Sequence, residues 1–254
     1  MEAFDLSGHV TVVTGGNRGI GLGMARGLAK AGARVAIWSR AADRNAAAVA
    51  ELEALGGEAV AVSCNVADEA SVGSAMAETL AALGKIDSLF ANAGTSGTAR
   101  FPADLDLDEW HRVVDVNLTG VFLTTRVVSE HLLERGESGS IVLTGSIVAR
   151  TALPLAPHYT ASKGAVLSYG RALAVRLGRH GIRVNVLSPG WIVTEMTEGV
   201  TTDARSADYF LKRTPLRRWG TAEDFEGPAV FLAAPASRFM TGAELVVDGG
   251  LTSA

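Results

Sequence analysis

Short apolar runs alternate with longer amphipathic stretches from one end of the chain to the other. The runs are rich in Val and Ile and do not alternate strictly with polar residues, which is typical of strands covered on both faces. Seven segments have this pattern: residues 9–14, 34–39, 59–63, 88–91, 140–144, 183–188 and 244–247. They predict the strands of a buried sheet.

Between these runs lie stretches rich in Ala and Leu. The predicted helices are residues 20–31, 43–55, 69–83, 118–134, 159–180 and 222–232. Strand–helix alternation predicts an α/β fold, a doubly wound Rossmann-type parallel sheet of about seven strands with helices on both faces. Residues 194–215 fit neither pattern, so we expect them to form a lid on a single domain that spans residues 1–254.

The composition supports one globular domain and excludes several function classes. The chain has 254 residues, of which 48% are hydrophobic, so it can bury a large core and is not of the disordered type. Lys and Arg number 23 against 27 Asp and Glu, for a net charge of −4. This mixed charge argues against a dedicated nucleic-acid binder or a polybasic membrane binder.

Cysteine and histidine usage predicts neither disulfides nor a metal site. Cys64 is the single cysteine, so we expect a buried thiol in a reducing compartment. The five histidines have no paired ligand spacing. The first residues contain two acids and no basic region, and no apolar run reaches about 18 residues, so we expect no signal peptide and no membrane span. A cytoplasmic protein is the resulting prediction.

The first predicted strand leads into a glycine-rich turn and then directly into a helix. Glycines with this spacing let the backbone approach a pyrophosphate, which binds at the helix N-terminus. The alternative is an ordinary tight turn, but the position after the first strand favours a dinucleotide site. The expected cofactor contacts here are Gly15, Asn17, Arg18, Gly19, Ile20 and Gly21.

The end of the second predicted strand favours NADP(H) over NAD(H), although NAD(H) stays open. A carboxylate at this place would bind the adenosine ribose and repel a 2′-phosphate, but the sequence has Ser39 and Arg40 there. Asp43 comes later and is typical of a helix N-cap. Arg40 and Arg18 together could hold a 2′-phosphate, unless both are ordinary solvated arginines.

A tyrosine and a lysine four residues apart open the long helix after the fifth strand. Helical spacing puts the side chains of Tyr159 and Lys163 on one face. We expect the ammonium, together with an oxidised nicotinamide, to lower the pKa of the phenol and make it a general acid or base. Ser146 follows the fifth strand and could polarise a substrate carbonyl, or simply cap its own loop.

These motifs resemble the short-chain dehydrogenase/reductase family over essentially the whole chain. The resemblance rests on the glycine turn, Asn117, the Ser146, Tyr159 and Lys163 set, and two further segments, Asn92-Ala93-Gly94 and Pro189-Gly190. It implies catalysis by Ser146, Tyr159 and Lys163, with Asn117 completing a proton relay through a water. It also implies a homotetramer and cofactor contacts from Ser39, Arg40, Asn65, Val66, Asn92, Ala93, Gly94, Tyr159, Lys163, Pro189, Gly190, Ile192 and Thr194.

Three positions depart from the pattern of that family. Ala91 replaces the first of a frequent Asn pair, and Gly145 stands where a second serine is common. Asn65 replaces an aspartate that meets the adenine amino group, and its amide oxygen can still accept that hydrogen bond. None of these changes removes a reacting group.

Three further residues border the expected substrate site. His158 is expected to be exposed at the entry of its helix, and Arg150 to be solvated. Trp191 could stack on a substrate or cover the nicotinamide. The apolar residues of the two long helices are expected to be mostly core.

The resulting hypothesis is an NADP(H)-dependent alcohol dehydrogenase or carbonyl reductase that acts on a small secondary alcohol or ketone. A 3-oxoacyl-thioester reductase and a sugar or polyol dehydrogenase both remain open. The alternative from another class is a catalytically idle dinucleotide-binding regulator, against which the complete Ser-Tyr-Lys-Asn set argues. A serine hydrolase is rejected because the G-x-S-x-G elbow is absent around Ser146.

Overall fold

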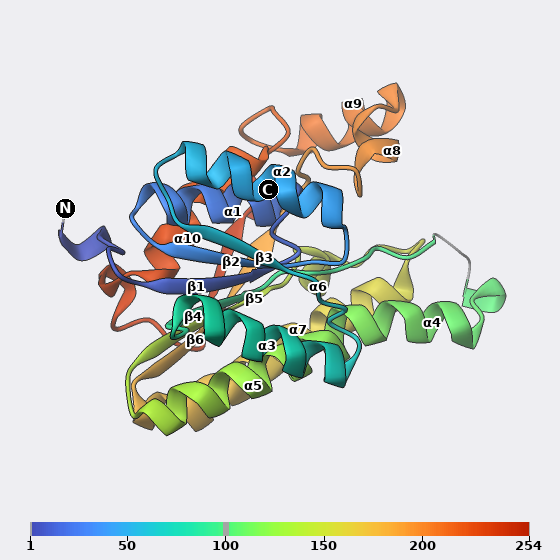
Figure 1. The fold of residues 1–254 in the computed structure, drawn as a ribbon. Coiled ribbons are helices and arrows are strands. Elements are labelled where there is room, and N and C mark those ends of the chain that lie inside the picture. Colours follow the sequence, from blue (N-terminus) through green and yellow to red (C-terminus); the bar gives the residue numbers. More distant parts are fainter. Residues whose placement is uncertain (1, 99–101, 254) are drawn as a thin grey trace.

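Seven parallel strands form one sheet in the computed structural model, which describes residues 2–98 and 102–253 (Figure 1). The strand order is β3-β2-β1-β4-β5-β6-β7. The strands are β1 (Val10–Thr14), β2 (Arg34–Trp38), β3 (Ala59–Val62), β4 (Ser88–Ala91), β5 (Gly139–Thr144), β6 (Ile182–Pro189) and β7 (Glu244–Val247). All seven predicted strands are therefore confirmed, as is the doubly wound sheet.

Helices cover both faces of this sheet (Figure 1). On one face lie α1 (Gly19–Lys30), α2 (Ala42–Ala54) and α10 (Glu226–Ala233); on the other lie α3 (Glu69–Leu83), α5 (Gly120–Arg135) and α7 (Pro157–Leu177). The remaining helices are α4 (Leu107–Val114), α6 (Val148–Thr151), α8 (Glu198–Thr201) and α9 (Ala204–Arg213). Among the described helices, none is long and apolar enough to cross a membrane.

The helix predictions need several corrections. Helix α4, which has few core-facing residues, and the four-residue α6 are not predicted from the sequence, and the expected lid segment 194–215 holds two helices, α8 and α9. Asp43 is not an N-cap, because α2 begins at Ala42 and Asp43 lies in its first turn. The predicted helix 222–232 begins as the 3-10 helix Ala222–Phe225 and continues as α10.

The sheet buries side chains on both faces. Within β2, Val35 and Ile37 join the core beneath α1, α2 and α10, whereas Ala36 and Trp38 join the core beneath α3, α5 and α7. Since successive side chains of a strand point to opposite faces, a strand buried on both must be apolar throughout. The uninterrupted apolar runs of the sequence have this physical cause.

The strand order reverses between β1 and β4, which are neighbours in the sheet. Val13 pairs with Phe90, so the carboxyl ends of the two strands lie side by side. In open parallel sheets this reversal leaves a crevice where ligands bind. The segments that follow β1 and β4 are therefore where the functional site is to be sought.

Helix α1 approaches α10 and the turn before it very closely through two glycines. A Cβ atom on Gly23 would lie 2.0 Å from the Ala222 carbonyl oxygen, and one on Gly27 would lie 2.5 Å from the Glu226 carbonyl oxygen. Both contacts are to backbone, which has little room to give way. Close packing of α1 against this region therefore depends on glycine at both positions.

We expect Gly27→Ala to lower the free energy of unfolding by about 1–3 kcal/mol, because the added methyl group overpacks the α1–α10 contact. Gly73→Ala is the matched control: Gly73 lies in α3, is exposed, and a Cβ there meets nothing within 4 Å. That control should raise stability by about 0.5–1 kcal/mol. Urea denaturation followed by circular dichroism measures both, and equal effects would contradict the packing argument.

Candidate active site

The Thr14 hydroxyl joins the ends of β1 and β4. It accepts hydrogen bonds from the backbone amides of Asn92 and Ala93, both at 2.9 Å, and the Asn92 side chain donates to the Thr14 carbonyl at 3.0 Å. The segment Asn92-Ala93-Gly94 is thereby held beside the glycine turn. Asn92 keeps this anchoring role although Ala91 replaces its usual partner.

The glycine turn folds tightly against this anchor. Gly15 has a φ of +64°, and a Cβ on it would lie 3.1 Å from the Ala93 Cα. A Cβ on Gly21 would lie 2.3 Å from the Gly15 carbonyl oxygen and 2.5 Å from Asn92 Nδ2. Glycine at these two positions is therefore required for the turn to close against the Asn92 segment.

The N-terminus of α1 is open to an anion. Its N-cap residue, Arg18, makes no side-chain capping hydrogen bond, whereas Asp68 and Asp106 cap α3 and α4. The first amides of α1 therefore lack a side-chain acceptor within the described chain, and the helix dipole favours negative charge there. This turn fits the pyrophosphate of a dinucleotide, as the sequence predicts.

Asn45, on α2, links the turn to the end of β2. Its Oδ1 accepts from Asn17 Nδ2 at 2.8 Å, and its Nδ2 donates to the Ser39 carbonyl at 2.9 Å. Both Asn17 and Asn45 are buried. Asn45 was not among the predicted site residues; the available signal was a polar residue on the buried side of an Ala-rich helix.

The charged groups near β2 differ from the expected arrangement. Arg40 is exposed, as a 2′-phosphate ligand would be. Arg18 forms an ion pair with Glu195, and so does Arg44, whose Nη1 lies 3.1 Å from the carboxylate. Neither Arg44 nor Glu195 was among the predicted site residues.

The segment after β6 also reaches the glycine turn. The Thr194 Cγ2 would lie 3.2 Å from a Cβ placed on Gly19, so these two expected cofactor residues are neighbours. Ile192 is buried, and Gly190 packs against Asp248, where a Cβ would meet the Asp248 Cβ at 2.6 Å. Pro189 ends β6 itself. These positions lie along the same edge of the sheet as Gly15 and Asn92.

Asn65 and Val66, the two expected cofactor residues after β3, take no part in the contacts around the glycine turn. Asn65 is exposed, and its Oδ1 accepts from the Ala67 amide at 3.4 Å. The Val66 side chain is buried in the core, where Gly120 leaves room for it. Their contacts with a cofactor stay a prediction.

The structure brings together the four expected catalytic residues. Ser146 follows β5 and is buried, and Tyr159 and Lys163 lie on the first turns of α7. Lys163 Nζ donates to the Thr144 carbonyl at 2.8 Å and lies 5.8 Å from the centre of the Tyr159 ring. The Ser146 hydroxyl lies close enough to the Tyr159 phenol to oppose the rise in its pKa.

Asn117 completes the group from a π-helical turn, Asp115–Thr119, between α4 and α5. Its Oδ1 accepts from the Thr95 amide at 2.8 Å, and its Nδ2 donates to the Thr95 carbonyl at 2.9 Å and to Ser162 Oγ at 3.1 Å. A Cβ on Gly94 would touch both Asn117 Oδ1 and Lys163 Nζ, at 3.3 Å and 3.7 Å. Asn117 therefore lies beside the lysine, and both of its amide hydrogens are in use.

Comparisons with known proteins agree with this geometry. A family model described as enoyl-(acyl carrier protein) reductase matches residues 15–252. Gluconate 5-dehydrogenase of Gluconobacter oxydans (strain 621H) is 39% identical over 251 residues, covering 99% of this chain and 97% of that protein. The 3-oxoacyl-[acyl-carrier-protein] reductase of Synechocystis sp. is 37% identical over 248 residues, covering 97% and 98%. The chain belongs to the short-chain dehydrogenase/reductase family.

A solved structure adds the cofactor. The gluconate 5-dehydrogenase of Burkholderia cenocepacia J2315, in complex with NADP and tartrate, is 39% identical with a TM-score of 0.95, covering 100% of this chain and 98% of that one. This short-chain dehydrogenase/reductase is accordingly an oxidoreductase of alcohol and ketone groups that prefers NADP(H). The idle dinucleotide-binding regulator is not favoured.

Burial dominates the ionisation of Tyr159 and Lys163 in this short-chain dehydrogenase/reductase. It lowers the pKa of Lys163 to about 8, since water cannot solvate the ammonium. It also raises the pKa of the Tyr159 phenol, which only the Ser146 hydroxyl opposes. Without a bound cofactor the pKa of Tyr159 is thus raised, and the lowering expected from Lys163 together with an oxidised nicotinamide stays a prediction.

His158 is fully buried, so the expectation that it is exposed is wrong. The unpredicted helix α4 covers it: Nε2 of His158 lies 3.7 Å from the Glu109 carboxylate, and neither ring nitrogen has a hydrogen-bond partner among the described residues. Hydrogen bonds from Arg112 and from the Thr98 amide lower the pKa of Glu109 to about 2. Gly97, with a φ of +73°, packs on this pair, where a Cβ would lie 2.3 Å from His158 Nε2.

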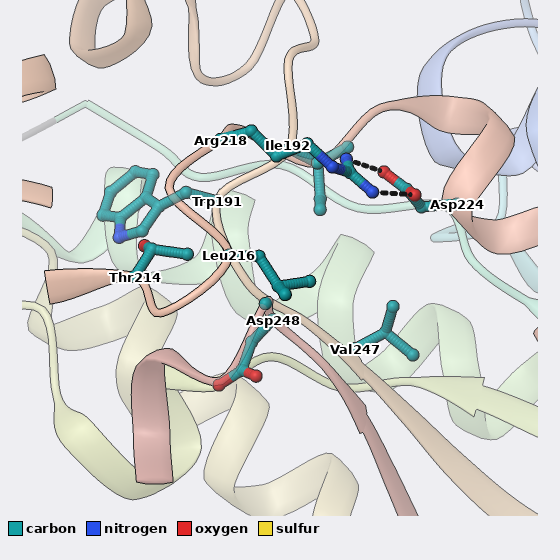
Figure 2. A pocket seen from close by; sticks show the side chains of 10 residues that line it. Trp191, Ile192, Thr214, Leu216, Arg218, Asp224, Val247 and Asp248 are labelled. Atoms are coloured by element: carbon teal, nitrogen blue, oxygen red, sulfur yellow. Dashed lines mark hydrogen bonds and ion pairs between the residues drawn. The ribbon is translucent and has the colours of Figure 1, made fainter. Parts of the chain in front are cut away.

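Trp191 lines a different cavity, of about 120 Å³, between the end of β7 and the segment after α9 (Figure 2). Its ring centre lies 4.5 Å from that of Phe210, so it packs against α9. Arg218 and Asp224 close one side of the cavity through paired hydrogen bonds of 2.7 Å and 2.6 Å (Figure 2). None of the four catalytic candidates lines this cavity.

Two other expectations for single residues have clear outcomes. Arg150 remains half exposed but is not merely solvated, because it forms an ion pair with the nearly buried Glu244 on β7. Cys64 is a buried free thiol, as predicted, and burial raises its pKa to about 11. This thiol is therefore protonated and unreactive at neutral pH.

We expect the buried ammonium to make stability depend on pH. The pKa of Lys163 is about 8 when folded and about 10.5 when unfolded, so between these values the unfolded chain binds more protons and stability rises with pH. Between pH 7.5 and pH 10, the free energy of unfolding of the cofactor-free wild type should rise by about 2–3 kcal/mol more than that of Lys163→Met. Urea unfolding at the two pH values measures this.

Lys212→Met is the control for this experiment, because Lys212 lies exposed on α9. Its difference from wild type should stay nearly constant between the two pH values. A Lys163→Met difference that is equally constant would contradict the assignment of a desolvated ammonium.

Proposed function

We propose that this short-chain dehydrogenase/reductase interconverts a secondary hydroxyl and the corresponding ketone on a sugar acid, using NADP(H). The observation that carries the proposal is the convergence of Ser146, Tyr159, Lys163 and Asn117 beside the glycine turn. The sugar-acid class is supported by the similarity to gluconate 5-dehydrogenases in sequence and in structure. The 3-oxoacyl thioester remains the alternative substrate, since a reductase of that kind is 37% identical.

In this proposal Ser146 and Tyr159 act directly on the substrate oxygen. The Ser146 hydroxyl hydrogen-bonds the carbonyl and polarises it, and the Tyr159 phenol donates the proton during reduction. The raised pKa of Tyr159 keeps the phenol protonated, as an acid must be before the reaction. When bound, the nicotinamide supplies or accepts the hydride.

Lys163 and Asn117 serve the proton path and the cofactor. The Lys163 ammonium holds the nicotinamide ribose and lies close enough to stabilise a Tyr159 phenolate. Both amide hydrogens of Asn117 already donate within the protein. A relay water on Asn117 therefore has to donate to its side-chain oxygen or to its backbone carbonyl oxygen. Reprotonation of Tyr159 then runs from solvent through that water and Lys163.

The cofactor site that we propose follows the same edge of the sheet. The turn from Gly15 to Gly21 and the open end of α1 bind the pyrophosphate, and Arg18 and Arg40 bind the 2′-phosphate. The segments after β3, β4 and β6 hold the adenine and the nicotinamide. They contribute Asn65, Val66, Asn92, Ala93, Gly94, Pro189, Gly190, Ile192 and Thr194.

The finer organisation of the protein is also part of the proposal. We regard residues 1–254 as one domain with residues 194–215 as its lid, and the protein as a homotetramer. Exposed apolar side chains on α5 and α7 support the assembly, namely Phe122 at 43%, Leu133 at 40% and Val175 at 86% exposed. The cytoplasmic location stays a prediction from the sequence.

The substrate proposal is tested by turnover. With NADPH we expect reduction of 5-keto-D-gluconate with a kcat/KM at least about tenfold above that for an acetoacetyl thioester. The reason is that a site that hydrogen-bonds substrate hydroxyl groups leaves its own polar groups unpaired when the thioester binds. Absorbance of the reduced nicotinamide reports both reactions. Preference for the thioester would overturn the sugar-acid assignment and leave the oxidoreductase intact.

Removing the proposed acid should stop the chemistry without stopping cofactor binding. For Tyr159→Phe we expect kcat to fall by about 10²–10⁴-fold, the usual contribution of a general acid, while the Kd of NADPH stays within about twofold. Tyr169→Phe is the control on the same helix, since its hydroxyl pairs with Thr125 at 3.0 Å. A Tyr159→Phe variant with the turnover of wild type would show that another group moves the proton.

A further inference from the structure

A carboxylate reaches the cofactor site from a part of the chain where the sequence gives no reason to look for one. Dinucleotide sites that select NAD(H) carry an acid at the end of the second strand, and this chain has Ser39 and Arg40 there. Glu195 follows Thr194, beyond β6, yet its side chain meets Arg18 of the glycine turn and Arg44 of α2. Glu195 thus brings a negative charge to two arginines that lie near the ends of β1 and β2.

The two arginines are held at the ends of β1 and β2 by buried contacts. Arg18 directly precedes α1, and Arg44 lies in the first turn of α2. The neighbouring side chains Asn17 and Asn45 are hydrogen-bonded to each other at 2.8 Å, and Asn45 also binds the Ser39 carbonyl. The backbone that carries the two arginines is therefore held in place by buried hydrogen bonds of the neighbouring residues.

Arg18 and Arg44 form a positively charged site in which the carboxylate of Glu195 is already bound. Two guanidiniums face one carboxylate, which leaves an excess of one positive charge. The hydrogen bond from Arg44 and the charges of both arginines lower the pKa of Glu195, so it is ionised at neutral pH. All three side chains are about half exposed, at 55% for Arg18, 48% for Arg44 and 57% for Glu195.

Such exposed ion pairs are weak, so a phosphate can replace the carboxylate. Pairs of this kind are screened by water and salt, whereas a phosphate monoester carries more charge and more acceptor oxygens than a carboxylate. Displacing Glu195 makes the binding free energy less favourable only for a cofactor whose phosphate binds these two arginines. NAD(H), which has no 2′-phosphate, binds without displacing it.

We infer that Glu195 is a specificity-determining residue that competes with the 2′-phosphate of NADP(H) for Arg18 and Arg44, and so reduces the preference for NADP(H) over NAD(H). This inference rests on the proposed cofactor site and adds Arg44 to its 2′-phosphate contacts. It makes the residue after Thr194 a determinant of cofactor choice.

Direct binding tests this inference without any substrate. For Glu195→Gln we expect the Kd of NADPH, measured by nicotinamide fluorescence, to fall by about three- to tenfold, since two weak ion pairs no longer compete. The Kd of NADH should change by less than about twofold. Glu198→Gln, three residues further on at an exposed position of the same segment, is the matched control and should leave both constants unchanged.

A double-mutant cycle assigns the effect to Arg44. In an Arg44→Gln background, Glu195→Gln should tighten NADPH by less than it does when Arg44 is present. The gain should also shrink in high salt, which screens exposed charges. An effect of Glu195→Gln that is the same with and without Arg44 would exclude Arg44 from the 2′-phosphate site and overturn that part of the inference.

The outcomes separate this inference from the proposed function. A protein that binds neither NADPH nor NADH would overturn both. If wild type binds NADPH and Glu195→Gln weakens it, leaves it unchanged, or tightens NADPH and NADH equally, the competition is refuted and the proposed function stands. Weaker binding of both cofactors would mean instead that Glu195 helps to hold the dinucleotide.

Discussion

The hydroxyl group of Thr14 connects the two halves of the site. It accepts two backbone hydrogen bonds from the segment after β4, and that segment continues through Gly94 to Thr95, which Asn117 binds at both its amide and its carbonyl. The glycine turn and the proposed catalytic residues are thereby connected through a few short segments. A parallel sheet makes this connection possible, because the carboxyl ends of neighbouring strands meet at one edge. Hydride transfer needs this closeness, since the reacting atoms must be held in contact.

Much of the fold and of the catalytic site could be predicted because the signals are local. A strand buried on both faces has to be apolar throughout, so the seven runs identify the sheet without knowledge of tertiary contacts. Tyr159 and Lys163 share a helix face by their spacing alone, and Ser146 directly follows a strand. In each case a few consecutive residues are enough to predict the feature. The structure brings these side chains together as predicted.

The residues that were missed or misjudged depend on contacts between distant segments. Glu195 pairs with Arg18, from which it is separated by 177 positions of sequence. Asn45 hydrogen-bonds Asn17, although α1 and β2 lie between them in the chain. His158 could not be recognised as buried because the helix that covers it, α4, buries little apolar surface and was not predicted. The lowered pKa of Lys163 was not predicted for a related reason. Its burial at 4% exposure follows from the packing around it rather than from its spacing to Tyr159.

The packing of Gly97 limits how this protein can be redesigned or can diverge. Any side chain at that position would occupy the space of His158 and Glu109, and its backbone conformation also favours glycine. The backbone between Thr95 and Thr98 is therefore confined between α7 and α4. New substrate preferences are therefore better sought in other segments around the site than by changing the course of this backbone.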